Sequence, residues 1–153
     1  MADWTNSDGL EVRFNGPEAG DTGAGVSTLG AVKNIVLDFD FATAITAAAD
    51  GHEAFVPAGS YIVGAYLIVT TAATSSGTAT LTIGLAQKDG TVIDADGIDV
   101  AIAQADLAAG KAVKCDGALV GGVVTTGSAP GYVYTTKGGT VTAGAAKLVI
   151  QYI

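Results

Sequence analysis

The segment NIVLDFDF, residues 34–41, decides the fold class because its side chains alternate between two characters. One face would carry Ile35, Leu37, Phe39 and Phe41, and the other would carry Val36, Asp38 and Asp40. A period of two residues is that of an extended strand with one face in the core and one in water. The segment therefore predicts a half-buried β-strand.

Further strands are predicted on both sides of this segment. TATLTIGL, residues 78–85, repeats the alternation, with Ala79, Leu81, Ile83 and Leu85 pointing inward. SYIVGAYLIVT, residues 60–70, is apolar on both faces, which is typical of a central strand covered on one side by the core and on the other by a loop or a neighbouring subunit. Shorter strands are predicted at 11–14, 53–56, 91–93, 119–124, 132–136 and 147–152.

Turn signals are frequent and helical signals are rare. The chain has 22 glycines, and Asp-Gly pairs such as Asp96-Gly97 favour tight turns. One short helix is predicted over residues 99–109, with Asp99 as its N-cap and Gly110 as its stop. Many short strands with little helix predict an all-β fold, an antiparallel β-sandwich of jelly-roll-like topology.

The glycine-rich segment 15–31 has almost no large apolar residue, so it is not expected to contribute to a core. We therefore expect an extended N-terminal arm over residues 1–31 and a β-sandwich domain over residues 32–153. A chain of 153 residues suits one such domain.

The composition points to an assembly subunit. Hydrophobic residues make up 49% of the chain and charged residues only 14%, so apolar area should remain outside the domain's own core and mark interfaces. The longest apolar runs are shorter than the ~20 residues of a membrane-spanning helix, and Asp3 and Asp8 do not suit a signal peptide. Only 7 Lys and Arg are present against 15 Asp and Glu, and the cations are scattered, so neither nucleic acid nor a membrane is an expected partner.

The acidic stretch DADGID, residues 94–99, is the strongest candidate for a chemical site. An EF-hand-type loop beginning at Asp94 would need glycine at its sixth position and glutamate at its twelfth, where this chain has Asp99 and Ala105. We predict no metal here, with Asp94, Asp96 and Asp99 as weak candidates only. Asp96-Gly97 is instead expected to form a turn after the strand at 91–93.

No catalytic constellation is apparent. His52 and Cys115, the only histidine and the only cysteine, lack a third orienting group in the sequence pattern. No phosphate-binding glycine motif is present either. The chain is predicted to have no cofactor and not to be an enzyme.

Four segments taken together resemble a known class of proteins. They are DWTNSDGLEVRF (3–14), FVPAGSYIVGAYLIVTTAATSSGTATLTIGL (55–85), DGTVIDADGIDVAIAQADLAAGK (89–111) and TAGAAKLVIQYI (142–153). In these the chain resembles small virion structural proteins of tailed bacteriophages, in particular capsid decoration (cement) proteins. The resemblance implies a homotrimer on the capsid surface of the virion, made in the host cytoplasm, that binds the major capsid protein at subunit junctions and stabilises the shell.

Candidate interface residues lie at the start of the chain and in the strand predicted at 132–136. They are Trp4, Leu10, Val12, Arg13, Phe14, Tyr132 and Tyr134. Because Tyr132 and Tyr134 are two residues apart, they would share one face of a strand, as an alternative function in carbohydrate or receptor binding would require. A tail or baseplate structural subunit is a further alternative.

Overall fold

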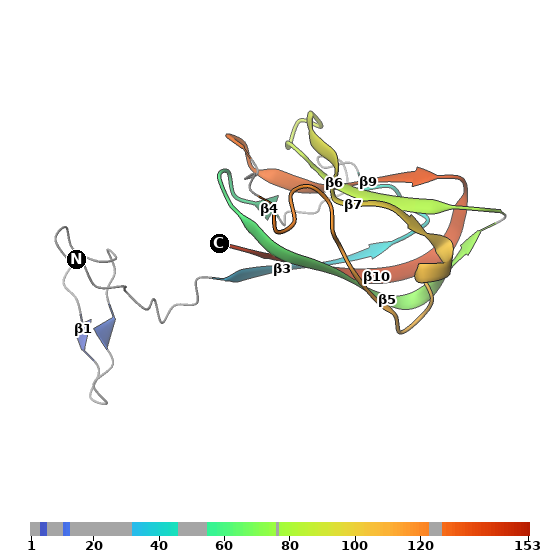
Figure 1. Ribbon diagram of the computed structural model, residues 1–153, viewed down its shortest axis with the longest axis horizontal. Helices are drawn as coiled ribbons and strands as arrows, with labels where there is room; N and C mark the ends of the chain where they lie inside the picture. Colours follow the sequence, from blue (N-terminus) through green and yellow to red (C-terminus); the bar gives the residue numbers. More distant parts are fainter. Residues whose placement is uncertain (1–3, 6–10, 13–31, 46–54, 76, 123–126) are drawn as a thin grey trace. The chain divides into compact units, whose positions relative to one another are not determined.

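The computed structural model describes residues 4–5, 11–12, 32–45, 55–75, 77–122 and 127–153 (Figure 1). The chain divides into two compact units, residues 1–31 and 32–153. In the first unit β1 (Trp4–Thr5) pairs antiparallel with β2 (Glu11–Val12), so that Trp4 lies opposite Val12. Leu10, Arg13 and Phe14 lie outside the described residues, and the extended character of the arm stays a prediction.

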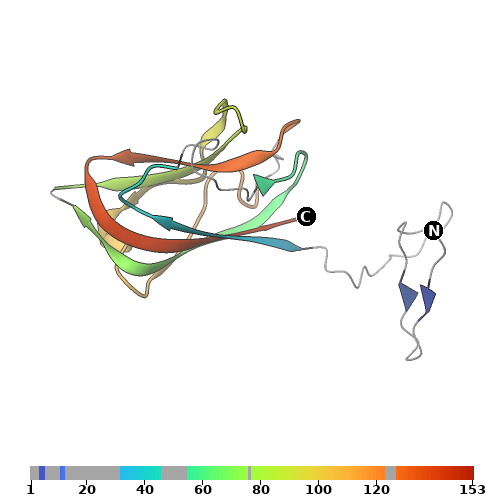
Figure 2. The same cartoon turned by 180° about the vertical axis from the view of Figure 1, so that it is seen from behind.

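The second unit consists of two opposed four-stranded antiparallel sheets (Figures 1 and 2). The first sheet has the order β3 (Lys33–Asp40), β10 (Val141–Tyr152), β5 (Ile62–Ser75) and β8 (Ala112–Lys114). The second has the order β4 (Phe55–Val56), β9 (Gly131–Gly138), β6 (Thr80–Ala86) and β7 (Val92–Ala103). Eight strands that pass between two sheets in this order form a jelly roll, so the predicted all-β sandwich is confirmed.

The alternation in the sequence places side chains as predicted. In β3, Leu37 is buried while Val36 is 57% exposed, and Phe41, just beyond the strand, is buried. Ala79, Leu81, Ile83 and Leu85 are all buried in or beside β6. The apolar segment at 60–70 forms β5, which lies between β10 and β8 and is therefore the predicted central strand.

One observed strand was not predicted, and one predicted strand is wrong. The short edge strand β8 was not expected, because AVK at 112–114 is too short to show a period. The strand predicted at 119–124 is wrong where the structure describes it: Leu119 lies in a turn, and Val120 makes one isolated bridge to Ile62. The loop there is held by turn hydrogen bonds, including Val120 N–H to the carbonyl of Gly117 at 2.9 Å.

The helix predicted over residues 99–109 is also wrong in extent. Residues 99–103 continue β7, where Asp99 pairs with Ile83 and Ile102 with Leu81, and only a 3-10 turn, η1 (Gln104–Asp106), follows. Pairing with β6 buries Ile98 and Ile102, and this burial outweighs the helix propensity of the alanine-rich segment. Asp99 is consequently not a helix cap. Of the helices that the described residues contain, none is long and apolar enough to cross a membrane.

Candidate interaction surfaces and the acidic bulge

The DADGID segment is a large bulge inside β7 and not a turn between two elements, which corrects the sequence prediction. Ile83 pairs with Asp99 and Leu85 with Asp94, so β6 advances two residues while β7 advances five. The loop after β8 holds the displaced backbone by two hydrogen bonds. Gly117 N–H donates to the carbonyl of Ile98 and Leu119 N–H donates to that of Gly97, both at 2.9 Å. The bulge is therefore a hydrogen-bonded part of the sandwich.

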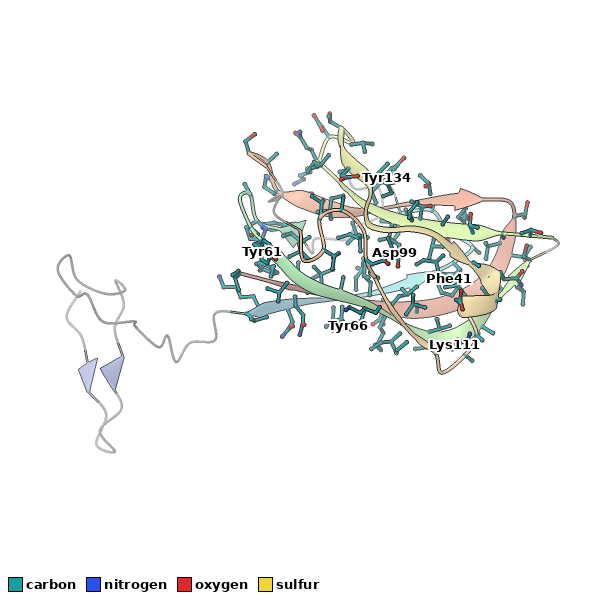
Figure 3. The ribbon with its side chains drawn as sticks, in the orientation of Figure 1. Phe41, Tyr61, Tyr66, Asp99, Lys111 and Tyr134 are labelled. Atoms are coloured by element: carbon teal, nitrogen blue, oxygen red, sulfur yellow. The ribbon has the colours of Figure 1, made fainter. Side chains whose placement is uncertain are left out.

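The three carboxylates of this segment do not converge on one point. Asp99 is only 6% exposed and lies between the two sheets (Figure 3). The buried Cys115 thiol is its side-chain hydrogen-bond partner. Asp94 and Asp96 are less buried and make a local turn contact, in which Asp96 N–H donates to Asp94 Oδ1 at 3.3 Å. No group of three or more His, Cys, Asp or Glu side chains within the described ranges is placed to hold a metal ion.

Burial controls the protonation of these groups. It raises the pKa of the Asp99 carboxyl, because a buried carboxylate loses its hydration, and the nearby charge of Asp116 raises it further. Burial also raises the pKa of Asp94, with Asp96 adding to the effect. The pKa of the Cys115 thiol rises to about 12, first through burial and then through Asp99. At neutral pH Cys115 is thus a protonated structural thiol, not an activated nucleophile; His52 lies outside the described residues.

The outer face of the first sheet carries an exposed apolar surface, which we call the β5 face: Val36, Val63, Tyr66, Ile68 and the half-buried Val149. Val149 of β10 lies opposite both Val36 of β3 and Tyr66 of β5, so these three side chains form one row across the sheet. Tyr66 is 38% exposed and Ile68 41%. The outward position of Tyr66 is visible in Figure 3. The β5 face therefore exposes aromatic and β-branched side chains together.

One ion pair interrupts this apolar face. In the next row of the sheet Lys147 lies opposite both Asp38 and Ile68. Lys147 Nζ donates to Asp38 Oδ1 at 2.7 Å, and both side chains are largely exposed. Because the two charges cancel, the centre of this face is close to neutral although the chain as a whole carries a net charge of −8.

The outer face of the second sheet carries a smaller aromatic row. Phe55 and Tyr132 have ring centroids 5.5 Å apart, and Phe55 is 41% exposed. Along β9 the side chains alternate between buried and half-buried, so Tyr132 and Tyr134 share the outer face while Val133 between them points into the core. The small residues Ala86 and Gly84 lie opposite the two tyrosines on β6.

The sequence-predicted candidates and the observed surfaces overlap only in part. Tyr132 and Tyr134 lie together, whereas Trp4 and Val12 are placed only by the backbone pairing of β1 with β2. Val36, Tyr66, Ile68 and Val149 were not among the interface candidates. The signal for Tyr66 and Ile68 is the segment at 60–70, whose apolar residues continue on the face that alternation assigns to solvent. Val36 and Val149 are likewise apolar residues on the solvent-facing side of their strands.

Comparison with solved structures finds a likeness in fold. No known protein-family model matches the chain, and no curated protein matches it. A solved chain of the cyanophage Pam1 capsid asymmetric unit shares its fold, with a TM-score of 0.56 and 19% sequence identity. The match covers 97% of this chain and 96% of that chain. The match therefore spans nearly the full length of both chains.

Proposed function

We propose that this chain is a capsid decoration protein of a tailed bacteriophage. It binds the outside of the capsid as a homotrimer at junctions between major capsid protein subunits, stabilises the shell and catalyses no reaction. It is made in the host cytoplasm and becomes part of the virion surface. The fold shared with a chain of a capsid asymmetric unit supports this assignment, and it is the reason to favour a capsid over other protein partners.

The observation that carries the proposal is the β5 face. A jelly roll builds its core from the inner faces of its sheets, so stability of the single chain does not require Tyr66, Ile68 and Val36 on the outside. Exposed aromatic and β-branched side chains gathered on one face are typical of a surface that a protein partner covers. We assign the β5 face to contact with the major capsid protein.

The mechanism of stabilisation is mass action. A protein that binds the assembled shell but not its dissociated subunits shifts the equilibrium toward the shell by RT ln(1 + [L]/Kd). The net charge of −8 would lie on the surface that stays exposed after binding, where repulsion between negatively charged particles reduces their association. No cofactor is needed for this function, and neither nucleic acid nor a membrane is a proposed partner.

The proposal is tested with empty shells assembled from the major capsid protein of the same phage. The protein should co-sediment with these shells at a fixed copy ratio and raise their thermal disruption temperature. The double variant Y66S/I68S should bind at least tenfold more weakly. The matched control is Y132S, which removes an aromatic from the opposite sheet and should bind as the wild type does. An unchanged disruption temperature at saturating protein would reject the stabilising role.

A second function is favoured by the aromatic row of Phe55, Tyr132 and Tyr134, because partly exposed aromatic rings on one face of a sheet suit stacking against sugar rings. In that case Y132S should lose binding on a glycan array while still binding capsids. Absence of glycan binding by the wild type on the array would rule out this function.

Negative-stain images of the purified protein separate the proposed trimer from a tail or baseplate subunit, which would form rings of six.

A further inference from the structure

The two four-stranded sheets have four edges, and three of them are poor templates for another strand. β4 has two residues and β8 has three. β7 is long but carries the acidic bulge and a positive φ of 50° at Ala101. β3 differs from all three, because its eight residues pair with β10 in one unbroken register from Lys33–Tyr152 to Asp40–Ala145. Soluble proteins commonly shorten, bulge or charge their edges to prevent pairing. β3 is neither short nor bulged, and the charge of Asp38 near its centre is offset by the ion pair with Lys147, so this long regular edge needs an explanation.

The backbone groups on that edge can be identified from the pairing. Phe41 N–H donates to the carbonyl of Gly144 at 2.8 Å, so odd-numbered residues of this segment bond to β10. The N–H and C=O groups of Asn34, Val36 and Asp38 therefore point away from β10, toward the free edge. Their side chains lie on the β5 face, and that of Val36 is the most exposed large apolar side chain in the described residues.

We propose that β3 pairs antiparallel with the β3 of a second copy of this chain, about a two-fold axis at Val36. In this register Val36 faces the Val36 of the other copy, and Asn34 faces the other copy's Asp38. Three residues on each strand then exchange hydrogen bonds with the other strand. The proposal goes beyond the decoration function and does not depend on it. As a two-fold contact it is additional to the three-fold contacts of the proposed trimer and would join two trimers.

Side-chain chemistry favours this register. The amide of Asn34 can donate to the carboxylate of Asp38, and the β-branched pair at Val36 is a favourable cross-strand combination. No like charges face each other, whereas a two-fold axis at Asp38 would set two carboxylates in opposition. The row of Tyr66, Val149 and Val36 would also continue directly into the same row of the second copy. Pairing thus joins two β5 faces into one surface across four strands from each copy.

Cysteine cross-linking of the full-length chain tests the register. Directly opposed residues of a hydrogen-bonded antiparallel pair have Cα atoms about 5.5 Å apart, within the range that a disulfide spans. V36C should therefore form a disulfide-linked dimer under mild oxidation. N34C and D38C should not do so alone, since each lies about 14 Å along the strand from its own copy at ~3.4 Å per residue, but a mixture of the two should cross-link. The native thiol adds little background because Cys115 is buried with a pKa of about 12.

A second variant separates pairing from folding. V36P removes only an N–H that faces the free edge, and proline is tolerated on that side of an edge strand. V36P should keep the wild-type circular dichroism spectrum, but analytical ultracentrifugation should show that the species joined by the two-fold β3 contact (a dimer, or a pair of trimers) is lost. V36T should keep that species. Cross-linking of V36C that is no faster than that of N34C would overturn the proposal. A V36C thiol that resists oxidation in a species of single-chain or trimer mass would also overturn the proposal, because something other than a second β3 would then cover this edge.

Discussion

The two long edge strands of the sandwich, β3 and β7, differ in regularity: β3 pairs in one unbroken register, and β7 is bulged. β3 keeps a regular register over its whole length and presents Val36 outward, whereas β7 bends over its own sheet and carries Asp99 into the core. The bulge packs against Gly84 and Gly117, which have no side chain, and its buried Asp99 has the Cys115 thiol as a hydrogen-bond partner. The conformation of β7 therefore depends on particular residues outside this strand. β3 depends mainly on the apolar residues of its inner face. A regular edge strand thus tolerates substitution on its outer face and can pair with another strand. A bulged edge strand requires particular neighbouring residues and is a poor template for pairing.

The largest effect on the comparison of β3 with β7 is expected from a side chain placed between β6 and the bulge of β7. A Cβ at Gly84 would overlap the backbone of Asp94 and Ala95, which cannot move without opening β7. G84V should therefore cost more than about 4 kcal/mol in the free energy of unfolding, or prevent folding. The control is G77V, in an open position with nothing within 4 Å of the added Cβ. Urea denaturation measures both, and similar midpoints for the two variants would refute the role given to Gly84.

The regular sheet should respond to core truncation in a graded way. Leu148 of β10 is fully buried, so L148A should lower the free energy of unfolding by about 2–5 kcal/mol through lost burial and a residual cavity. V149A removes the neighbouring, outward side chain of the same strand and should cost less than about 1 kcal/mol. Equal losses from the two substitutions would contradict the assignment of inner and outer faces.

The smallest expected effect concerns the buried acid of β7 and depends on pH. Because the pKa of Asp99 is raised in the folded state, the native protein binds this proton more tightly than the unfolded chain does. Its stabilising contribution is complete below the unfolded pKa of about 3.9 and is lost as pH rises through the folded value. The wild type should therefore gain stability relative to D99N as pH falls from 7 to 4, by on the order of 1 kcal/mol.

Melting temperatures across that pH range measure the difference between wild type and D99N. The control is D106N, since Asp106 is exposed and its ion pair with Lys111 at 3.3 Å contributes little. The pH profile of D106N should stay parallel to that of the wild type. If the wild type and D99N also ran parallel from pH 7 to 4, Asp99 would not be the source of the pH dependence.

Prediction from sequence succeeded where one local period decided the structure. NIVLDFDF and TATLTIGL have only one way to bury their apolar residues, so strand type, inner face and sheet class all follow from the alternation. It failed in the segment 94–109, where aspartates, glycine and alanines favour a turn and a helix locally. There, pairing with β6 buries Ile98 and Ile102, and that non-local gain exceeds the local preference.

The candidate surfaces divide along the same line. Alternation is local, so the shared face of Tyr132 and Tyr134 and the double-sided apolar character of residues 60–70 can be seen in the amino-acid order. Which strands become neighbours depends on contacts between residues far apart in the chain. Folding alone brings Val36, Val149 and Tyr66 into one row and turns Asp99 toward Cys115. It also leaves β3 as a long edge strand with no second neighbouring strand among the described residues.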